Sequence, residues 1–210
     1  MGLFRHALVS VAAIAALAYA LPAAEPVAGP PVPAPAGIYF SDPAHTSVSW
    51  SVSHMGLSHW TSRFVGAEAT LDWRPESPER SRLTARIEPS SVRTDYPWPE
   101  KADFDATLAH SEDFFAGRLI SFASTGVEIT GRNTGRVHGD LTMRGETHPV
   151  VLDVTFNGSM AAHPITGTPR VGFSARTTIQ RSDWGMVALL PAIGDDVELV
   201  IESQFGPQVD

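Results

Sequence analysis

The chain has 210 residues, of which 43% are hydrophobic, so it is long enough to bury the core of one domain or two. Its formal net charge of −8 at pH 7 argues against a nucleic-acid-binding surface and leaves no basic platform for an anionic membrane. Cysteine is absent, which excludes disulfides, thiol catalysis, thiolate metal ligation and a lipid-modified N-terminal cysteine.

The first residues have the features of a secretory signal peptide. Arg5 precedes an apolar run over residues 7–21, and Ala18-Tyr19-Ala20 supplies a small-x-small cleavage site, with cleavage after Ala23 as a close alternative. The run is too short and too rich in alanine to favour a membrane span, so an uncleaved anchor is the less favoured alternative. We therefore expect a signal peptide over residues 1–23 and a periplasmic or secreted mature protein.

A proline-rich segment separates this signal from a domain expected over residues 37–207. The composition of residues 24–36 predicts an extended linker rather than packed structure. The segment Asp42-Pro43-Ala44-His45 predicts a turn. Residues 47–54 then alternate serines with large side chains, which predicts a strand with one polar and one apolar face.

The alternation continues in segments further along the chain. Strands are expected over residues 65–73, with a bulge or bend at Gly66, and over residues 82–88. Another strand is expected over residues 120–129, where Gly126 shifts the phase of the alternation. Each of these segments has one apolar face that requires a partner surface.

A helical excursion interrupts the strands. The prolines of Tyr96-Pro97-Trp98-Pro99 make a stiff break, and residues 100–115 are compatible with a short helix. Phe104, Leu108 and Phe115 are spaced to share one face of it.

The clearest pattern is a hairpin over residues 135–158. Its first strand alternates up to Leu141 and Met143, and after a turn near Gly145 the alternation resumes. Pro149 lies at the start of the second strand, where its missing N–H is least disruptive. Both strands are expected to direct one apolar face into a shared core.

Two further strands complete the fold prediction. They are expected over residues 171–180 and 197–201, and the last should pair with an early strand and so remove the exposed edges. About eight strands with little helix predict an all-β fold, an antiparallel eight-stranded β-barrel with a short helical excursion between strands. A β-sandwich is the alternative.

Four separated motifs resemble those of the YceI-like family, in the same order. They are D-P-A-H-T-S-V-x-W-S-V-x-H-M-G-L at residues 42–57, S-x-D-F-F at 111–115, G-D-L-T-x-x-G-x-T-x-P-V-x-L-x-V at 139–154, and G-F-S-A-x-T-x-I-x-R-S-D-W-G-M at 172–186. The family is lipocalin-like and binds polyisoprenoid lipids. The resemblance extends over about residues 37–205, and it implies a lipocalin-like barrel with a long-chain lipid ligand.

The resemblance has two departures, both near the expected mouth of the barrel. The basic residue that the family usually has upstream of S-x-D-F-F is represented only by His110. The connection from Phe115 to the strand at Ile120 is shorter than usual. The family's mode of head-group recognition therefore cannot be transferred to this chain.

Catalytic and metal-binding motifs are weak in this sequence. There is no G-x-S-x-G elbow, and the histidines lack H-x-H or H-E-x-x-H spacing, so we expect no enzyme activity, metal site or cofactor. One alternative is an enzyme that uses a His/Asp pair at the mouth, with His54 or His110 beside Asp113 or Asp183. Another is an interaction barrel with a solid core. The leading hypothesis is a carrier whose partner is an isoprenoid or similar long-chain lipid, and no nucleic acid.

The candidate ligand contacts are mainly aromatic, aliphatic and sulfur-containing side chains, which suit an alkyl or prenyl chain. They are Trp50, Val52, His54, Phe64, Leu108, Phe114, Phe115, Phe122, Leu141, Met143, Phe156, Phe173, Trp184 and Met186. The candidate head-group contacts are Arg63, His110, Arg181 and Asp183. For Arg181 and Asp183, bracing of their own loop is favoured over ligand contact, because short polar loop motifs more often order the backbone.

Overall fold

The structure is a computed structural model that describes residues 33–208. The predicted signal peptide and residues 24–32 of the predicted linker lie outside the described residues. The strands are β1 (Gly37–His54), β2 (Ser58–Phe64), β3 (Ala67–Trp73), β4 (Arg82–Ile87), β5 (Val92–Arg93), β6 (Ile120–Ile129), β7 (Thr134–Met143), β8 (Glu146–Met160), β9 (Arg170–Gln180) and β10 (Ile193–Gly206). The helical segments are α1 (Phe104–His110) and the 3₁₀ turns η1 (Pro78–Arg80), η2 (Pro89–Ser91) and η3 (Arg181–Trp184).

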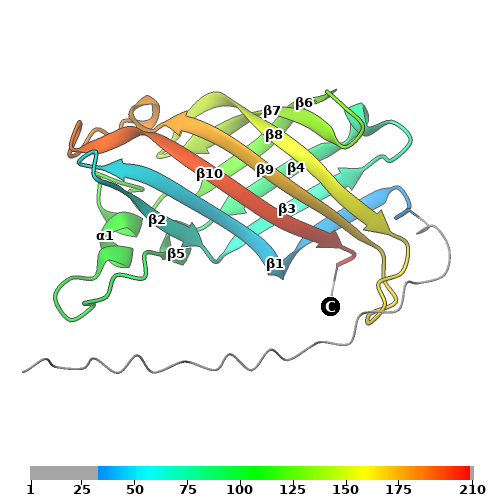
Figure 1. Cartoon of the computed structure of the whole chain (residues 1–210), viewed down its shortest axis with the longest axis horizontal. Coiled ribbons are helices and arrows are strands. Elements are labelled where there is room, and N and C mark those ends of the chain that lie inside the picture. Colours follow the sequence, from blue (N-terminus) through cyan, green and yellow to red (C-terminus); the bar gives the residue numbers. More distant parts are fainter. Residues whose placement is uncertain (1–32, 209–210) are drawn as a thin grey trace, which may run out of the picture. The chain divides into compact units, whose positions relative to one another are not determined.

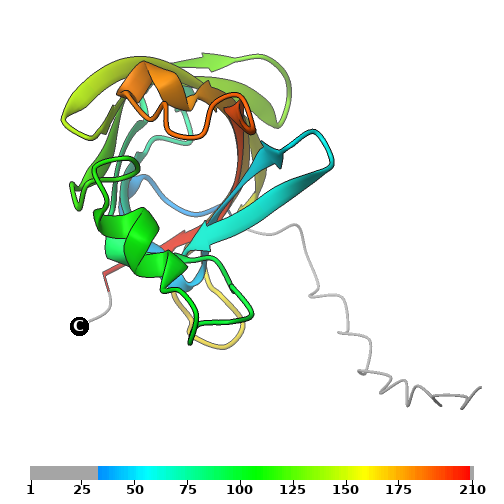
Figure 2. The same ribbon diagram turned by 90° about the vertical axis from the view of Figure 1, so that its left-hand side faces the viewer.

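Eight of these strands form a closed antiparallel barrel, which confirms the predicted fold class. Around the ring the order is β1, β3, β4, β6, β7, β8, β9 and β10, and pairing of β10 with β1 closes it. Figure 1 shows the long strands crossing the molecule obliquely, and Figure 2 looks into the barrel from one end. At that end the short strand β2 pairs with β1, and β5 pairs with β2. The predicted helical excursion is also confirmed, since α1 lies between β5 and β6.

The barrel closes on β1, which pairs on both of its edges. Residues 37–40 of β1 pair with β3, and residues 48–54 pair with β2. The other edge pairs with β10 in both parts of the strand. β2 and β3 therefore follow one another along the same edge of β1, with the break predicted at Gly66 between them.

The turn predicted at residues 42–45 is wrong, because the chain stays within β1 and bulges instead. Its register with β10 shifts between Ser41 and Thr46. The Asp42 carboxylate accepts a hydrogen bond from the Ala44 amide at 2.9 Å and pairs with His45 at 3.0 Å, so the bulge supplies its own polar partners. Although burial raises the pKa of Asp42, the hydrogen bonds from His45 and Ala44 bring this pKa below its ordinary value.

The alternation of side chains separates the interior of the barrel from its surface. In the β7–β8 hairpin, Leu141 and Met143 face the interior, whereas Asp140 and Val151 are exposed. The predicted phase shift at Gly126 is confirmed by a register shift in the pairing of β6 with β7. Period-2 patterning thus orients each strand, as expected for a barrel with a wet exterior.

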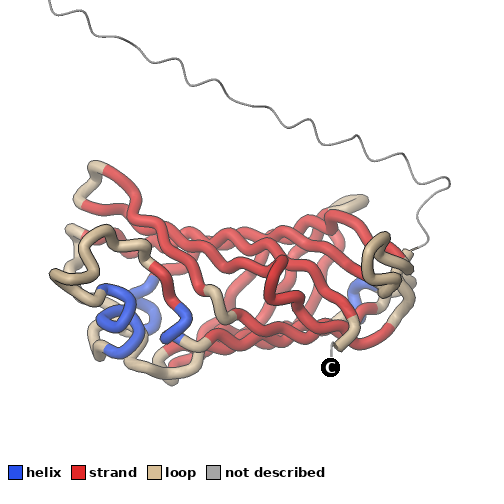
Figure 3. The backbone as a smooth tube through the Cα atoms, turned by 90° about the horizontal axis from the view of Figure 1, so that it is seen from below, coloured by secondary structure: helices blue, strands red, loops and turns tan. Residues whose placement is uncertain are grey.

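The two ends of the barrel differ in structure. We call one the helix end, formed by the β1–β2 turn, the segment 88–119 with α1, the β7–β8 turn and the loop 181–192. The other is the loop end, formed by residues 74–81, 130–133 and 161–169. Figure 3 shows the helical segments gathered mainly at the helix end. Within residues 33–208, no helix is long and apolar enough to cross a membrane.

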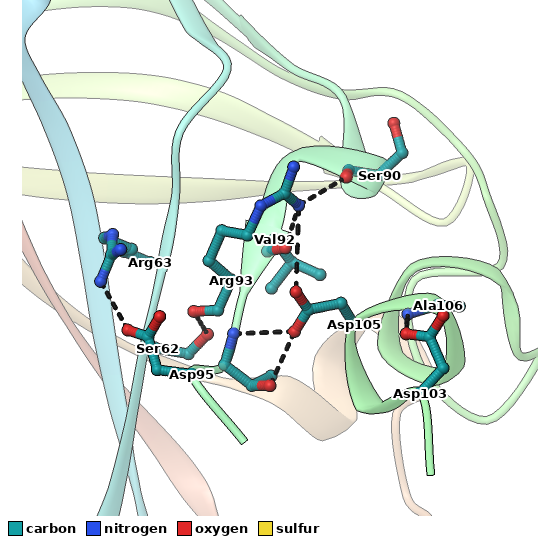
Figure 4. Close-up of polar contacts among 10 residues, drawn as sticks. Ser62, Arg63, Ser90, Val92, Arg93, Asp95, Asp103, Asp105 and Ala106 are labelled. Atoms are coloured by element: carbon teal, nitrogen blue, oxygen red, sulfur yellow. Dashed lines mark hydrogen bonds and ion pairs between the residues drawn. The ribbon is translucent and has the colours of Figure 1, made fainter. Parts of the chain in front are cut away.

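Polar contacts attach α1 to the barrel at the helix end (Figure 4). The Asp103 side chain caps the helix by accepting a hydrogen bond from the Ala106 amide at 2.9 Å. The Asp105 carboxylate accepts hydrogen bonds from the amide and hydroxyl of Thr94, at 2.8 and 2.7 Å. Leu108 and Ala109 are buried, and they lie three and four residues after Asp105, on the same face of the helix. α1 therefore serves as part of the wall of the barrel rather than as a separate element.

Candidate ligand-binding cavity

The barrel encloses a cavity of about 810 Å³ that extends from one end to the other. This volume is within the range of about 300–1,000 Å³ that is typical of ligand sites. The lining comes from every strand of the ring and is predominantly apolar. It includes Val48, Leu83, Ile87, Ile120, Val137, Val150, Leu152, Val154, Ile179, Leu199 and Ile201. The interior is therefore hollow, which argues against the alternative of an interaction barrel with a solid core.

Thirteen of the fourteen predicted lipid contacts line this cavity: Trp50, Val52, His54, Phe64, Leu108, Phe114, Phe115, Phe122, Leu141, Met143, Phe156, Phe173 and Met186. Trp184 is buried but does not line the cavity. Its indole Nε1 donates a hydrogen bond to the Leu141 carbonyl at 3.2 Å, its ring packs against His148, and only 2% of its surface is exposed. Trp184 thus supports the β7–β8 hairpin from outside the cavity.

Aromatic rings from opposite sides of the barrel meet near the loop end. Trp73 on β3 stacks on Phe156 of β8 at 5.6 Å between ring centroids and meets Phe173 of β9 at 5.8 Å. Phe173 also contacts Phe205 of β10 at 6.1 Å. We call these four residues the aromatic plug. Because β3 and β8 lie four strands apart in either direction around the ring, their contact crosses the interior and narrows the cavity.

The sequence prediction included Phe156 and Phe173 but missed Trp73 and Phe205. Trp73 follows Leu71 by two residues in a strand that was expected, so it shares the apolar phase of that strand. Phe205 lies beyond the predicted closing strand, which continues further than expected. The alternation of side chains in this strand was therefore sufficient to predict that Trp73 faces the interior.

At the helix end, α1 and the residues after it fill the gap between β2 and β6. The rings of Phe64 and Phe115 meet edge to face at 5.4 Å. Leu108 and Phe114 also line the cavity at this level. The helix α1 and the residues after it therefore complete the apolar wall of the cavity.

Arg181 is the buried cation of the lining, and backbone carbonyls engage it. Its Nε donates to the Gly194 carbonyl at 2.8 Å, Nη1 to Met186 at 2.6 Å, and Nη2 to Ala188 and Ile193 at 2.9 and 3.0 Å. Burial lowers the pKa of this guanidinium, and the Asp195 carboxylate acts in the opposite direction. With four of its five N–H donors used, Arg181 organises the loop 181–192.

The carboxylate that pairs with this loop is Asp195 rather than Asp183. Asp195 accepts hydrogen bonds from the amide and hydroxyl of Ser182, at 2.9 and 2.7 Å. The Asp183 side chain is exposed and does not line the cavity. The geometry therefore shows that Arg181 braces its own loop, whereas the Asp183 side chain does not.

The architecture and the sequence motifs agree with a known family. Residues 39–205 match the YceI-like domain. The chain belongs to the YceI-like family. The UPF0312 proteins of Pseudomonas fluorescens (strain SBW25) and Pseudomonas putida (strain GB-1) are each 34% identical to it over 145 residues, which are 68% of this chain and 71% of theirs.

Solved structures show the same YceI-like fold. BcnA of Burkholderia cenocepacia superposes with a TM-score of 0.66 at 19% identity, over 78% of this chain and 98% of that one. The YCEI protein of Campylobacter jejuni has a TM-score of 0.61 at 26% identity, over 75% and 90%. A polyisoprenoid binding domain from Saccharophagus degradans has a TM-score of 0.54 at 12% identity, over 83% and 100%.

Two predicted head-group contacts lie outside the cavity of this YceI-like barrel. Arg63 on β2 is 47% exposed and pairs with Asp95 at 2.6 Å (Figure 4). His110 is exposed at the end of α1. Neither side chain lines the cavity, so the structure does not bring the head-group candidates together.

Histidine–carboxylate pairs in the YceI-like barrel also lie outside its cavity. Among the described residues, such pairs within 4.0 Å are Asp42–His45, Glu128–His138 and Glu146–His148, and none of these histidines lines the cavity. His54 lines the cavity and is half-buried. In residues 33–208, no group of three or more His, Asp or Glu side chains is placed to hold a metal ion.

Proposed function

We propose that this protein is a non-enzymatic carrier that sequesters or transports a polyisoprenoid, or a similar long-chain amphiphilic lipid, inside the barrel. The observation that carries the proposal is the apolar cavity of about 810 Å³ that extends along the whole barrel. An alkyl or prenyl chain gains free energy from every apolar surface that it covers there, at roughly 25 cal/mol per Å². The Saccharophagus degradans domain, described as polyisoprenoid binding, shares this fold and supports the proposed ligand class.

Arg82 and Arg132 line the cavity at the loop end, where both are exposed, and Arg181 is the buried cation of the lining. The buried part of the lining favours a neutral lipid head group over a phosphate or diphosphate. A phosphate requires donors that are available to its oxygens, usually from arginine or lysine. The guanidinium of Arg181 already donates to four carbonyls of the protein. In contrast, the indole Nε1 atoms of Trp50 and Trp73 are buried without a partner among the described residues, and both indoles line the cavity. Such neutral donors suit a carbonyl, hydroxyl or ether oxygen.

Lipid extraction and mass spectrometry of the protein isolated from its native envelope test this carrier function. We expect a neutral long-chain lipid in the wild-type protein and its loss from Met143→Trp, because the larger ring obstructs the cavity. Met143 is 4% exposed and lines the cavity, whereas Val151 is 41% exposed on the outer face of the adjacent strand. Val151→Trp is therefore the matched control and should retain the lipid. Absence of lipid from the wild-type protein, before and after incubation with a polyprenol, would falsify the proposal.

We further propose that the carrier is exported and acts in the periplasm or outside the cell. The basis is the sequence of residues 1–23, with Arg5, the apolar run and the small-x-small site. N-terminal sequencing of the envelope protein should find a start between about residues 20 and 24. An intact Met1 on membrane-bound material would instead indicate an anchored carrier.

A further inference from the structure

Large apolar side chains face solvent around the helix end of the barrel. We call them the rim: Met55, Leu57, Trp98, Phe104, Val187 and Leu189. Leu57 at the tip of the β1–β2 turn is 86% exposed, and Leu189 in the loop 181–192 is 63% exposed. The Met55 amide donates a hydrogen bond to the Ala192 carbonyl at 2.6 Å, which joins these two segments. Figure 2 looks onto this end, with α1, the β1–β2 hairpin and the loop 181–192 around the interior.

Two rim residues are unfavourable for folding in both their backbone conformation and the exposure of their side chains. Met55 and Leu189 have φ values of 54° and 62°, in the left-handed region that glycine and asparagine adopt most easily. Each also places a large apolar side chain in water. Residues held in sparsely populated conformations are typical of sites with a function other than stability. The rim is therefore better explained by an external contact than by folding.

The rim is continuous with the cavity at the helix end. Phe104 and Leu189 line the cavity and also belong to the rim. At the loop end the aromatic plug crosses the interior, with Trp73 stacked on Phe156. An apolar cargo therefore enters and leaves most easily between the rim residues.

A ladder of aromatic rings extends from the cavity to the surface at this end. Trp60, which lines the cavity, stacks on Phe104 at 5.8 Å, and Phe104 contacts Tyr96 at 4.7 Å. Tyr96 in turn meets Trp98 at 5.7 Å, and the Lys101 ammonium lies 4.8 Å from the centre of the Trp98 ring. Tryptophan and tyrosine rings that end in a lysine at the surface match the composition that proteins place at a membrane–water interface.

We propose that the rim docks on the surface of a lipid bilayer, with Leu57, Val187 and Leu189 inserted among the lipid head groups. The partner is a neutral, zwitterionic bilayer, because the chain has a net charge of −8 and gains no attraction from anionic lipid. Docking would let a lipid chain pass between membrane and cavity without crossing water. Docking itself requires no bound lipid. The proposal therefore rests on the proposed carrier function only for the biological purpose of docking.

Flotation with phosphatidylcholine vesicles tests the proposal on the protein isolated from its native envelope. The wild-type protein should float with the vesicles at low and at high salt, since the contact is apolar. The double variant Leu57→Glu/Val187→Glu should bind about tenfold or more weakly, because both exposed side chains lose their insertion. Ile165→Glu at the loop end is the matched control. Ile165 is 88% exposed, much as Leu57 is, and its substitution should leave binding unchanged.

Several outcomes overturn the docking proposal. One is a wild-type protein that remains in the buffer fraction instead of floating with the vesicles. Another is a double variant that floats with the vesicles as well as the wild-type protein does. Equal loss of binding in Ile165→Glu would show that any exposed apolar residue suffices. A wild-type dimer in light scattering that becomes monomeric in the double variant, without vesicle binding, would identify the rim as an interface between two copies of the chain. Lipid analysis of the same samples separates the two proposals, because a protein that carries lipid but does not float retains its carrier function.

Discussion

At the residue scale, the guanidinium of Arg181 is surrounded by four backbone carbonyls of its own loop and of β10. This arrangement leads to a prediction for Arg181→Met, which keeps most of the side-chain volume and removes the donors. Each buried carbonyl left without a partner costs roughly 1–3 kcal/mol. We expect a free energy of unfolding lowered by at least that amount in urea titrations. Lipid occupancy per folded molecule should remain close to that of the wild-type protein.

Asp183→Asn provides the comparison at the same loop. Its carboxylate is exposed, so the free energy of unfolding should change by no more than about 0.5 kcal/mol. The two variants together distinguish a brace from a ligand contact. If Arg181→Met melts like the wild-type protein but contains no lipid, Arg181 holds the head group and our interpretation of its role is wrong.

At the scale of elements, the aromatic plug narrows the cavity near the loop end. Trp73→Leu removes the ring that crosses from β3 to β8 and leaves an apolar side chain in its place. The cost in stability should be below the roughly 3–5 kcal/mol typical of truncating a buried tryptophan to alanine. Because the cavity is then wider near the loop end, a longer chain can pass this point and the bound lipids should shift to longer chains. Mass spectrometry of the extracted lipids measures this shift.

Trp184→Leu is the control for this prediction. Trp184 is 2% exposed but does not line the cavity, and its indole Nε1 donates a hydrogen bond to the Leu141 carbonyl. Its replacement should lower the melting temperature and leave the chain length of the bound lipid unchanged. Equal lipid profiles in Trp73→Leu and the wild-type protein would show that the plug does not limit the cargo.

The elements also show which structural features can be predicted from sequence. Strand faces follow a local period of two residues, so the interior positions of Leu141 and Met143 were predicted from their neighbours alone. The predicted turn at Asp42 is a bulge instead, because Asp-Pro is compatible with both and only the pairing with β10 distinguishes them. Contacts across the barrel, such as Trp73 with Phe156, depend on the register of closure, which no local pattern specifies.

At the scale of the whole molecule, the cavity itself was beyond prediction from composition or periodicity. The same apolar faces would fill a solid core or line a hollow one, because the difference lies in how far apart the opposite walls stand. The rim residue Leu57 illustrates a second limit. Its apolar side chain is unremarkable in the sequence, and its significance comes from its position beside Val187 and Leu189, which lie in a different loop.

The closed barrel and its cavity lead to a prediction about stability and ligand. Hydrogen-bonded pairing from β1 round to β10 involves backbone alone, so the delipidated protein should remain folded by circular dichroism. A neutral polyprenol that binds only the folded state should then raise the melting temperature. At a ligand concentration one hundred times Kd the gain in the free energy of unfolding is about 2.7 kcal/mol, which corresponds to roughly 5–10 °C for a chain of this size.

Met143→Trp should melt at one temperature with or without polyprenol, since its cavity is obstructed, whereas Val151→Trp should respond as the wild-type protein does. A wild-type protein that unfolds on delipidation would show that the lipid is part of the core, and the cavity would then be a space that cannot persist without its contents.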